Sequence, residues 1–199
     1  MEVRTTEHQT RTAQARFETR EDDGGAPRIE GYFAVFGQVY DICPGGSESV
    51  DPHAFDCAID GQDIRCLVDH ETRLVLGRTA AGTLTLKADE HGLWGSVAIN
   101  PDDSDAMNLL ARVRRGDVSQ CSFGFDILDE ETDYREDGSI HWTIKAVRLY
   151  EVSVVTFPAY TDTQVQARSE DIKAIRRRQA QALRARLLKR LGKDVENGT

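Results

Sequence analysis

The chain has 199 residues, of which 39% are hydrophobic and 30% are charged, the balance of a soluble globular protein with one domain and short extensions. No stretch reaches the roughly 18 uncharged apolar residues of a membrane helix, and the first residues lack the apolar segment of a secretion signal. The net charge of −9 disfavours a protein that binds duplex DNA.

The N-terminal residues 1–27 are polar and contain few large apolar side chains, which predicts a flexible arm. Residues 29–37 are aromatic and β-branched, which favours a strand. A loop rich in glycine and proline follows around residues 43–46. Asp51 and Pro52 can then begin a short helix over residues 54–59, as N-cap and first helical residue.

The middle of the chain predicts mostly strands. Apolar or alternating segments cover residues 64–68, 74–79, 83–88 and 93–99, and residues 89–92 form a good hairpin connection between the last two. A helix is expected to begin near Asn100, because the apolar residues that follow have helical spacing. Gly116 is placed to end this helix.

Three further strands are expected over residues 121–128, 140–147 and 149–156, with an acidic turn at residues 129–138. Many short strands with one or two inserted helices indicate an antiparallel β-barrel or sandwich rather than a doubly wound sheet. We expect a mainly β domain with flanking helices over residues 28–167.

The C-terminal tail, residues 168–199, differs from the body in charge and in periodicity. It holds ten Lys/Arg and four Asp/Glu, a net +6, whereas the remainder of the chain carries −15. Apolar residues spaced three and four apart predict a basic amphipathic helix. Such a helix packs on its own domain or is frayed in solvent, or else it binds a partner, forms a coiled coil or tethers the protein to RNA or an acidic surface. The sequence leaves these alternatives open.

The sequence carries no motif for a metal ion or cofactor, and we predict neither. The four cysteines form no CxxC pair, so reduced thiols are expected: Cys43, Cys57, Cys66 and Cys121. HExxH, EF-hand, Walker and GxGxxG patterns are absent. The acidic run that begins at Asp102 fits the N-terminus of a helix better than a metal site.

Of the five histidines, His70 is the strongest candidate for chemistry. It follows the apolar strand at residues 64–68, and reactive groups are often held at strand ends on a rigid scaffold. Polar surface remains the ordinary role of such a histidine. The others lie in the arm, in turns or in a strand of unknown orientation: His8, His53, His91 and His141.

Ser122 is the serine most worth weighing, since Gly124 shares its face of the predicted strand and leaves that face open to a substrate. The bland alternative is a strand serine bonded to a neighbour. Cys121 is an alternative nucleophile, but adjacent strand residues face opposite ways, so only one of the two can meet His70. The GxSxG pattern of α/β-hydrolases is absent.

Glu151 stands in an otherwise mostly apolar strand. A carboxylate there either faces water or is buried beside a histidine or arginine, because burial without a partner is costly.

Taken in order, several segments resemble the tailed-phage prohead (capsid maturation) serine proteases, which are related to the herpesvirus assemblin proteases. The segments are Gly31–Phe36, Pro52–Phe55, Leu67–His70, Leu74–Arg78, Asp89–Leu93, Cys121–Phe125 and Leu149–Tyr160. His53 departs from the glycine usual at its position in that family. The resemblance spans roughly residues 29–167.

The resemblance implies an antiparallel β-barrel of the herpesvirus-protease type and a serine endopeptidase that cleaves capsid scaffold, or the scaffold-like segment of the major capsid protein, and itself. The family's histidine, nucleophile and third member match His70, Ser122 and Glu151. His70 would take the proton of Ser122, and Glu151 would orient the imidazole. The donors for the oxyanion are not placed, and Arg148 is only a remote candidate.

The same resemblance implies the setting. The partners are the major capsid protein and the scaffold protein as substrates, with a homodimer as a further expectation and neither membrane nor specific nucleic acid. The site of action would be the host cytoplasm, inside the assembling prohead. A catalytically silent capsid-assembly or scaffolding protein on the same barrel is the competing hypothesis.

Overall fold

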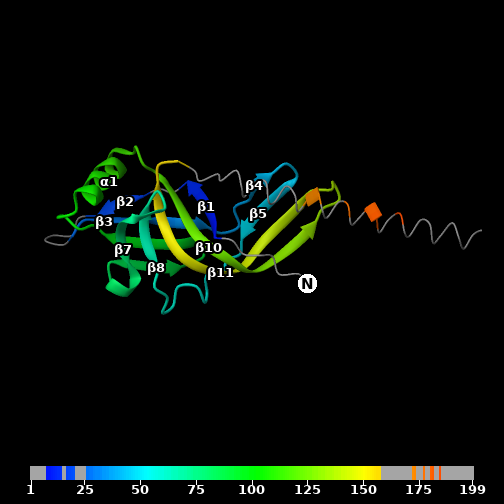
Figure 1. Cartoon of the computed structure of the whole chain (residues 1–199), viewed down its shortest axis with the longest axis horizontal. Helices are drawn as coiled ribbons and strands as arrows, with labels where there is room; N and C mark the ends of the chain where they lie inside the picture. The colour runs from blue at the N-terminus through cyan, green and yellow to red at the C-terminus, as the bar shows by residue number, and fades with distance from the viewer. Residues whose placement is uncertain are drawn as a thin grey trace, which may run out of the picture.

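The computed structural model describes residues 8–14, 17–20 and 26–157, together with residues 172, 173, 177, 180, 181 and 184 (Figure 1). Between residues 8 and 157 the described chain is built mainly from strands, with one α-helix and one turn of 3-10 helix. In order these are β1 (Gln9–Gln14), β2 (Glu18–Arg20), β3 (Arg28–Val35), β4 (Tyr40–Cys43), β5 (Gly46–Val50), β6 (Arg65–Val68), β7 (Glu71–Arg78), η1 (Thr79–Ala81), β8 (Leu84–Ala88), β9 (Gly92–Ala98), α1 (Ser104–Arg115), β10 (Gln120–Tyr134) and β11 (Ile140–Val155).

The strands form two sheets. The larger has seven strands in the order β1-β10-β11-β5-β4, with β6 added to β11 and β7 added to β6. The smaller has the order β2-β3-β9-β8. Apolar side chains of both sheets and of α1 meet in one core, whose largest fully buried members include Phe33, Phe55, Phe123, Phe125, Leu93 and Leu110.

A long hairpin of β10 and β11 organises the larger sheet. The two strands have 15 and 16 residues and pair antiparallel from Gln120 opposite Val155 to Tyr134 opposite Ile140. The break expected around Arg148 does not occur, and the acidic segment from Asp129 to Tyr134 continues the strand. Backbone pairing therefore outweighs the low strand propensity of the acidic residues here.

The mainly β prediction is confirmed, but the closed antiparallel barrel is wrong. The strands form two sheets that are not closed into a barrel, and β5 and β6 both run parallel to β11. The reason is the length of β11: β5 pairs with its first part and β6 with its last part, so two short strands share one edge. Parallel pairing of this kind needs crossover connections, which the sequence pattern did not reveal.

Several local predictions can be compared with the structure. The helix near Asn100 is confirmed as α1, with the Asp103 carboxylate accepting from two backbone N–H groups and Gly116 at φ +84° behind it. The helix over residues 54–59 is wrong: Asp51 does cap the segment, but the chain forms successive turns closed by bonds such as Ala54 N–H to the Asp51 carbonyl. The loop expected around residues 43–46 is a turn at residues 44–45, and the strands β4 and β5 on either side of it were not predicted.

Parts of the N-terminal arm also form strands: β1 pairs with β10, and β2 pairs with β3. Their polar composition concealed this, because edge strands need few apolar residues. The division of the chain into three domains remains a prediction.

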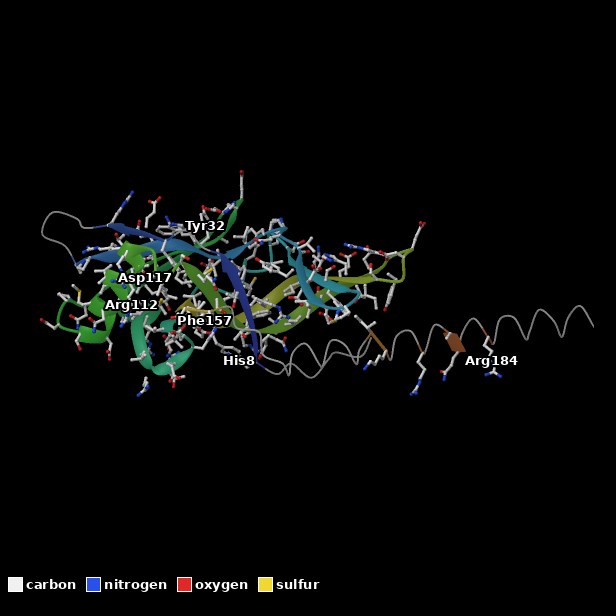
Figure 2. All side chains as sticks on the ribbon, turned by 90° about the horizontal axis from the view of Figure 1, so that it is seen from above. His8, Tyr32, Arg112, Asp117, Phe157 and Arg184 are labelled. Atoms are coloured by element: carbon white, nitrogen blue, oxygen red, sulfur yellow. The ribbon has the colours of Figure 1, made fainter. Side chains whose placement is uncertain are left out.

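At the C-terminal tail, Ile172 is buried against Cys43, Ile140 and Trp142. The few described residues beyond it are helical and exposed, and Figure 2 shows Arg184 well away from both sheets. Most of residues 168–199 lie outside the described residues, so the amphipathic helix remains a prediction there. No described helix is long and apolar enough to cross a membrane.

Candidate active site

One face of the β10–β11 hairpin is polar near the start of β10 and the end of β11. Ser122 pairs with Ser153, and Gly124 pairs with Glu151. Alternate residues of a strand share a face, so these four lie together on the side opposite the core residue Phe123. Ser122 and Ser153 are fully buried and Glu151 is nearly so. Strand alternation and the register of the hairpin thus place the Ser122 hydroxyl and the Glu151 carboxylate on the same face of the sheet.

His70 reaches this face from the tight turn between β6 and β7. Asp69 and His70 both have positive φ, +48° and +61°, a conformation that non-glycine residues adopt rarely and at a cost. The Asp69 carboxylate accepts hydrogen bonds from the Thr156 backbone N–H at 2.7 Å and its hydroxyl at 3.1 Å. The turn is therefore tied to the end of β11, and this tie holds the imidazole over the hairpin.

The His70 ring and the Glu151 carboxylate form a close pair. The distance from His70 Nδ1 to Glu151 Oε1 is 2.7 Å, and Ser153 Oγ donates to Glu151 Oε2 at 2.6 Å. With a carboxylate as acceptor, the proton of the neutral imidazole lies on Nδ1, which leaves the lone pair on Nε2. His70 Nε2 is buried and has no hydrogen-bond partner among the residues that the structure describes. The pair therefore presents an unoccupied basic nitrogen.

The Ser122 hydroxyl makes its hydrogen bond to another group. It donates to the backbone carbonyl of Arg11 in β1 at 2.9 Å. Strand β1 lies along β10, with Thr12 opposite Ser122 and Thr10 opposite Gly124 (Figure 1). The structure thus joins two of the three predicted site residues by a hydrogen bond and places the third on the same face, bonded to the N-terminal strand.

The space above Gly124 is occupied by the carboxylate of Glu151 and is not open to a substrate. A Cβ atom at this position would collide with the carboxylate of Glu151 and lie 2.8 Å from His8 Nε2. The His8 ring contacts the ring of Tyr150, with 5.1 Å between centroids. The lack of a side chain at Gly124 does create space beside Ser122, as predicted, but Glu151 and His8 occupy that space.

The cysteines near the site are poorly suited to be nucleophiles. Cys121 is completely buried in the core, on the face of β10 opposite to Ser122. Cys66 is also buried, and its burial, together with the charge of Glu151, raises the pKa of the thiol strongly. Both effects disfavour the thiolate, which is the reactive form.

The remaining predicted candidates lie elsewhere. His53 pairs with Asp56 at the surface, and His91 stacks edge-on against Tyr32. His141 lies between two serine hydroxyls of β5. Arg148, the remote candidate for oxyanion stabilisation, is exposed and 4.0 Å from Asp126. Among the described residues, no group of His, Cys, Asp and Glu is arranged to hold a metal ion.

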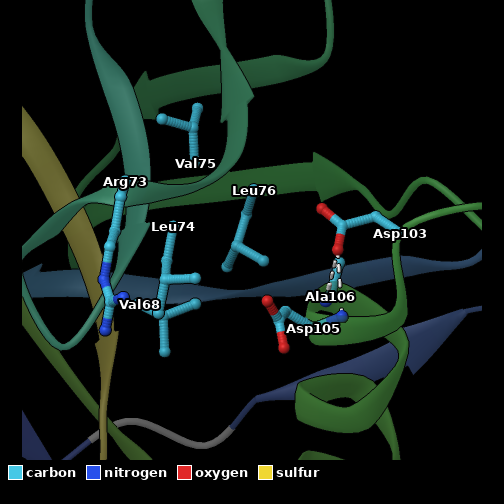
Figure 3. A pocket seen from close by; sticks show the side chains of 8 residues that line it. All are labelled: Val68, Arg73, Leu74, Val75, Leu76, Asp103, Asp105 and Ala106. Atoms are coloured by element: carbon cyan, nitrogen blue, oxygen red, sulfur yellow. Dashed lines mark hydrogen bonds between the residues drawn. The ribbon is translucent and has the colours of Figure 1, made fainter.

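A small cavity of about 140 Å³ lies between β7 and the start of α1 (Figure 3). One of the residues that line it, Val68, is two positions before His70 in the sequence. Five of the residues that line it are apolar and three are charged: Val68, Arg73, Leu74, Val75, Leu76, Asp103, Asp105 and Ala106. None of the three predicted site residues lines it, so the cavity is not the site of the chemistry.

Sequence reasoning missed the groups that support the candidate triad. Ser153 could have been found, because it is two residues from Glu151 and must share its face. The tie between Asp69 and Thr156 links residues 87 positions apart and has no local signal. The same is true of the ion pair between Arg11 and Glu48, which joins the N-terminal arm to β5.

Comparison with known proteins identifies the family of this chain. The sequence profile of the caudovirus prohead serine proteases matches residues 15–178. The chain belongs to this family. It is 31% identical over 140 residues to the prohead protease of Enterobacteria phage HK97, an alignment that covers 69% of this chain and 58% of that protein.

The fold also resembles that of the bacteriophage T4 capsid assembly protease. The TM-score is 0.53 at 12% sequence identity, over 78% of this chain and all of the compared chain. At this identity the likeness concerns the fold alone. The resemblance to the prohead proteases predicted from the ordered motifs is confirmed.

Proposed function

We propose that this member of the prohead protease family is a serine endopeptidase that cleaves capsid scaffold, or the scaffold-like segment of the major capsid protein, and itself. The observation that carries the proposal is the bond between His70 and Glu151, which leaves a basic nitrogen on the face that holds Ser122. The names of the relatives support a role in capsid assembly.

Catalysis begins when the hydroxyl of Ser122 exchanges its bond to the Arg11 carbonyl for one to His70 Nε2. His70 takes the hydroxyl proton as Ser122 Oγ forms a bond to the carbonyl carbon of the scissile peptide. The carbon–nitrogen bond then breaks, and the leaving amine takes the proton from His70. Water, activated by the same nitrogen, hydrolyses the ester and restores Ser122.

Glu151 has two roles in this cycle. Its Oε1 fixes the imidazole with the proton on Nδ1, and its charge stabilises the imidazolium that forms during attack. Ser153 holds Oε2, so the carboxylate cannot rotate without breaking a second hydrogen bond. The low exposure of the group strengthens both interactions, because water screens them little.

The enzyme is proposed to act inside the assembling prohead in the host cytoplasm. Its basic C-terminal segment would dock it to scaffold, to the capsid protein or to a second copy of itself as a homodimer. A chain truncated after residue 167 should be incorporated into proheads less efficiently. Unchanged incorporation would reject the docking role of the tail.

The bond from Ser122 to Arg11 favours a second candidate, a catalytically silent capsid-assembly or scaffolding protein on the same fold, because it keeps the hydroxyl from its base. One experiment separates the two. The full chain and its Ser122→Ala variant are co-expressed with the capsid and scaffold proteins, and cleavage is followed by gel and mass spectrometry.

Ser49→Ala is the matched control, since Ser49 also contacts a histidine but lies on β5. A peptidase gives products with wild type and Ser49→Ala and none with Ser122→Ala. Products that persist with Ser122→Ala contradict the assignment of the nucleophile, and a lack of products with wild type favours the silent protein.

A further inference from the structure

A buried ion pair connects β1 to β5 on the core side of the larger sheet, because Arg11 lies opposite Phe123 and its side chain shares that face. The Arg11 guanidinium donates to both carboxylate oxygens of Glu48, from Nε at 2.5 Å and from Nη2 at 2.9 Å. Glu48 is fully buried and Arg11 is 7% exposed. The guanidinium carbon also lies 5.5 Å from the centre of the Phe125 ring. Carboxylate and aromatic ring thus form a compact receptor for a planar cation.

The stability of this buried site depends on the positive charge that it binds. A buried carboxylate that loses its positive partner is strongly unfavourable, because no water replaces the lost interaction. The neighbouring Tyr40 shows the local environment: burial, with contributions from Cys121 and the charge of Glu48, raises the pKa of its phenol to about 12. A chain segment that replaces β1 therefore loses the ion pair between Arg11 and Glu48 unless it supplies a positive charge of its own.

Strand β1 lies where a substrate strand would lie. It is the outermost strand of the larger sheet and pairs antiparallel with β10 through six register positions, from Gln9 to Gln14. Extended peptides commonly bind by adding a strand to such an edge. The carbonyl that touches the Ser122 hydroxyl is that of Arg11 itself. The residue that presents its carbonyl to the nucleophile is thus the one whose side chain enters the Glu48 receptor.

We propose that Glu48 and Phe125 form the specificity pocket of the peptidase and select arginine or lysine as the substrate residue whose carbonyl Ser122 attacks. This inference rests on the proposed function and adds its substrate class: peptides cut on the carboxyl side of a basic residue. Arg11 occupies the pocket in this structure and displays how a substrate arginine is held. Neutral and acidic residues are disfavoured because they cannot replace the two charged hydrogen bonds that Arg11 donates to Glu48.

The first test identifies the cut sites. The full chain is co-expressed with its capsid and scaffold proteins, and the new C-termini are read by mass spectrometry. The pocket predicts arginine or lysine at those termini. Cuts that depend on Ser122 but follow other residues overturn the inference and leave the peptidase intact. Cleavage that is absent, or that persists with Ser122→Ala, contradicts the proposed function and with it this inference.

The second test measures the pocket directly with peptides that carry the β1 sequence Gln-Thr-Arg-Thr-Ala-Gln. With glutamine in place of the arginine, kcat/KM is expected to fall by at least about 100-fold, as when a buried polar group is left unpaired. The lysine peptide should retain most of the rate. Equal cleavage of the arginine and glutamine peptides would contradict the proposed pocket. This test uses the wild-type chain, so it does not depend on the folding of a variant.

The variant Glu48→Gln should reduce this preference to less than about tenfold, because an amide tolerates a neutral partner. The matched control is Glu131→Gln, which removes an exposed carboxylate of β10 and should leave the preference unchanged. Circular dichroism shows whether each variant is folded. A folded Glu48→Gln that keeps the full preference for arginine would contradict the assignment of Glu48.

Discussion

The β10–β11 hairpin contributes to two clusters of serine and histidine, and only one of them is suited to catalysis. Near the end of β11, His70 bonds to Glu151 through Nδ1 and leaves Nε2 without a partner. Near its beginning, His141 bonds to Ser47 through Nδ1 at 2.8 Å and to Ser49 through Nε2 at 2.9 Å. Both clusters contain serine and histidine side chains from the larger sheet, although His70 lies in the turn between β6 and β7.

The difference lies in what the second ring nitrogen can do. At His141 both nitrogens are engaged by serine hydroxyls, and no carboxylate in the described part of the chain bonds to the ring. The arrangement ties β5 to β11. At His70 the carboxylate fixes the proton on Nδ1 and would stabilise the charged ring. A histidine beside a serine is therefore weak evidence for a peptidase, whereas a histidine with a buried carboxylate on one nitrogen and a vacant second nitrogen is much stronger.

The largest expected effect comes from removing the proton donor, Ser122, or the proton acceptor, His70. Ser122→Ala and His70→Ala should each lower kcat by roughly 10⁵- to 10⁶-fold, as in other serine peptidases. Ser47→Ala, in the other cluster, should leave the rate within about twofold. The measurement is the initial rate of capsid-protein cleavage, and a comparable loss with Ser47→Ala would remove the distinction between the clusters.

Glu151→Gln should lower kcat by roughly 10⁴-fold, because an amide can donate to Nδ1 and so favours the wrong tautomer. Its shape is nearly that of glutamate, so the fold is preserved. Single-turnover rates across pH are the measurement. A loss of less than about tenfold would show that the carboxylate is structural only.

Gly124→Ala tests the close approach of the carboxylate to β10. The new methyl group would collide with Glu151 and displace it, and a shift of about 1 Å at a catalytic group can cost about 100-fold in rate. The effect should fall on kcat rather than KM. An unchanged rate would mean that Glu151 does not need its observed position.

Ser153→Ala should have a smaller effect, because it removes one hydrogen bond to a carboxylate that keeps its other partner. Such a bond is worth about 1.5 kcal/mol, which corresponds to about tenfold in kcat. Ser153→Thr, which retains the hydroxyl, should recover part of the rate. If neither variant changed the pH profile or the rate, Ser153 would have no positioning role.

The smallest effect concerns stability at the second cluster. Burial and the nearby Arg135 lower the pKa of His141 below its usual 6.5. The folded state then favours the neutral ring, so its stabilising contribution is complete above pH 6.5 and is lost as the pH falls below that value. Urea unfolding at pH 7.5 and 5.5 should show a larger loss for wild type than for His141→Gln. Equal losses would contradict this role for His141.

The sequence predicted the fold class and α1 well, because strand alternation and helix caps are local signals. It did not predict the two parallel strands beside β11, since the pairing of β5 and β6 depends on distant backbone. It also missed β1, whose six residues are nearly all polar. An edge strand with one buried arginine has no hydrophobic pattern from which it could be recognised.

For the site, the ordered motifs predicted His70, Ser122 and Glu151, and the structure joins the first and last of these by a hydrogen bond. The assignment of all three as a catalytic triad remains a prediction. What could not be predicted is the conformation of the site: the bond from Ser122 to Arg11, the positive φ values at Asp69 and His70, and the carboxylate over Gly124. Each depends on contacts between segments that the sequence alone does not place together.

The most direct test of the account is the reaction of the purified full chain with a fluorophosphonate, followed by peptide mapping. The reagent modifies a serine only where a neighbouring base activates it. The account predicts one adduct, on Ser122, which disappears in His70→Ala and persists in His141→Gln. An adduct on Ser47 or Ser49, or an unmodified Ser122 in a preparation that cleaves capsid protein, would contradict it.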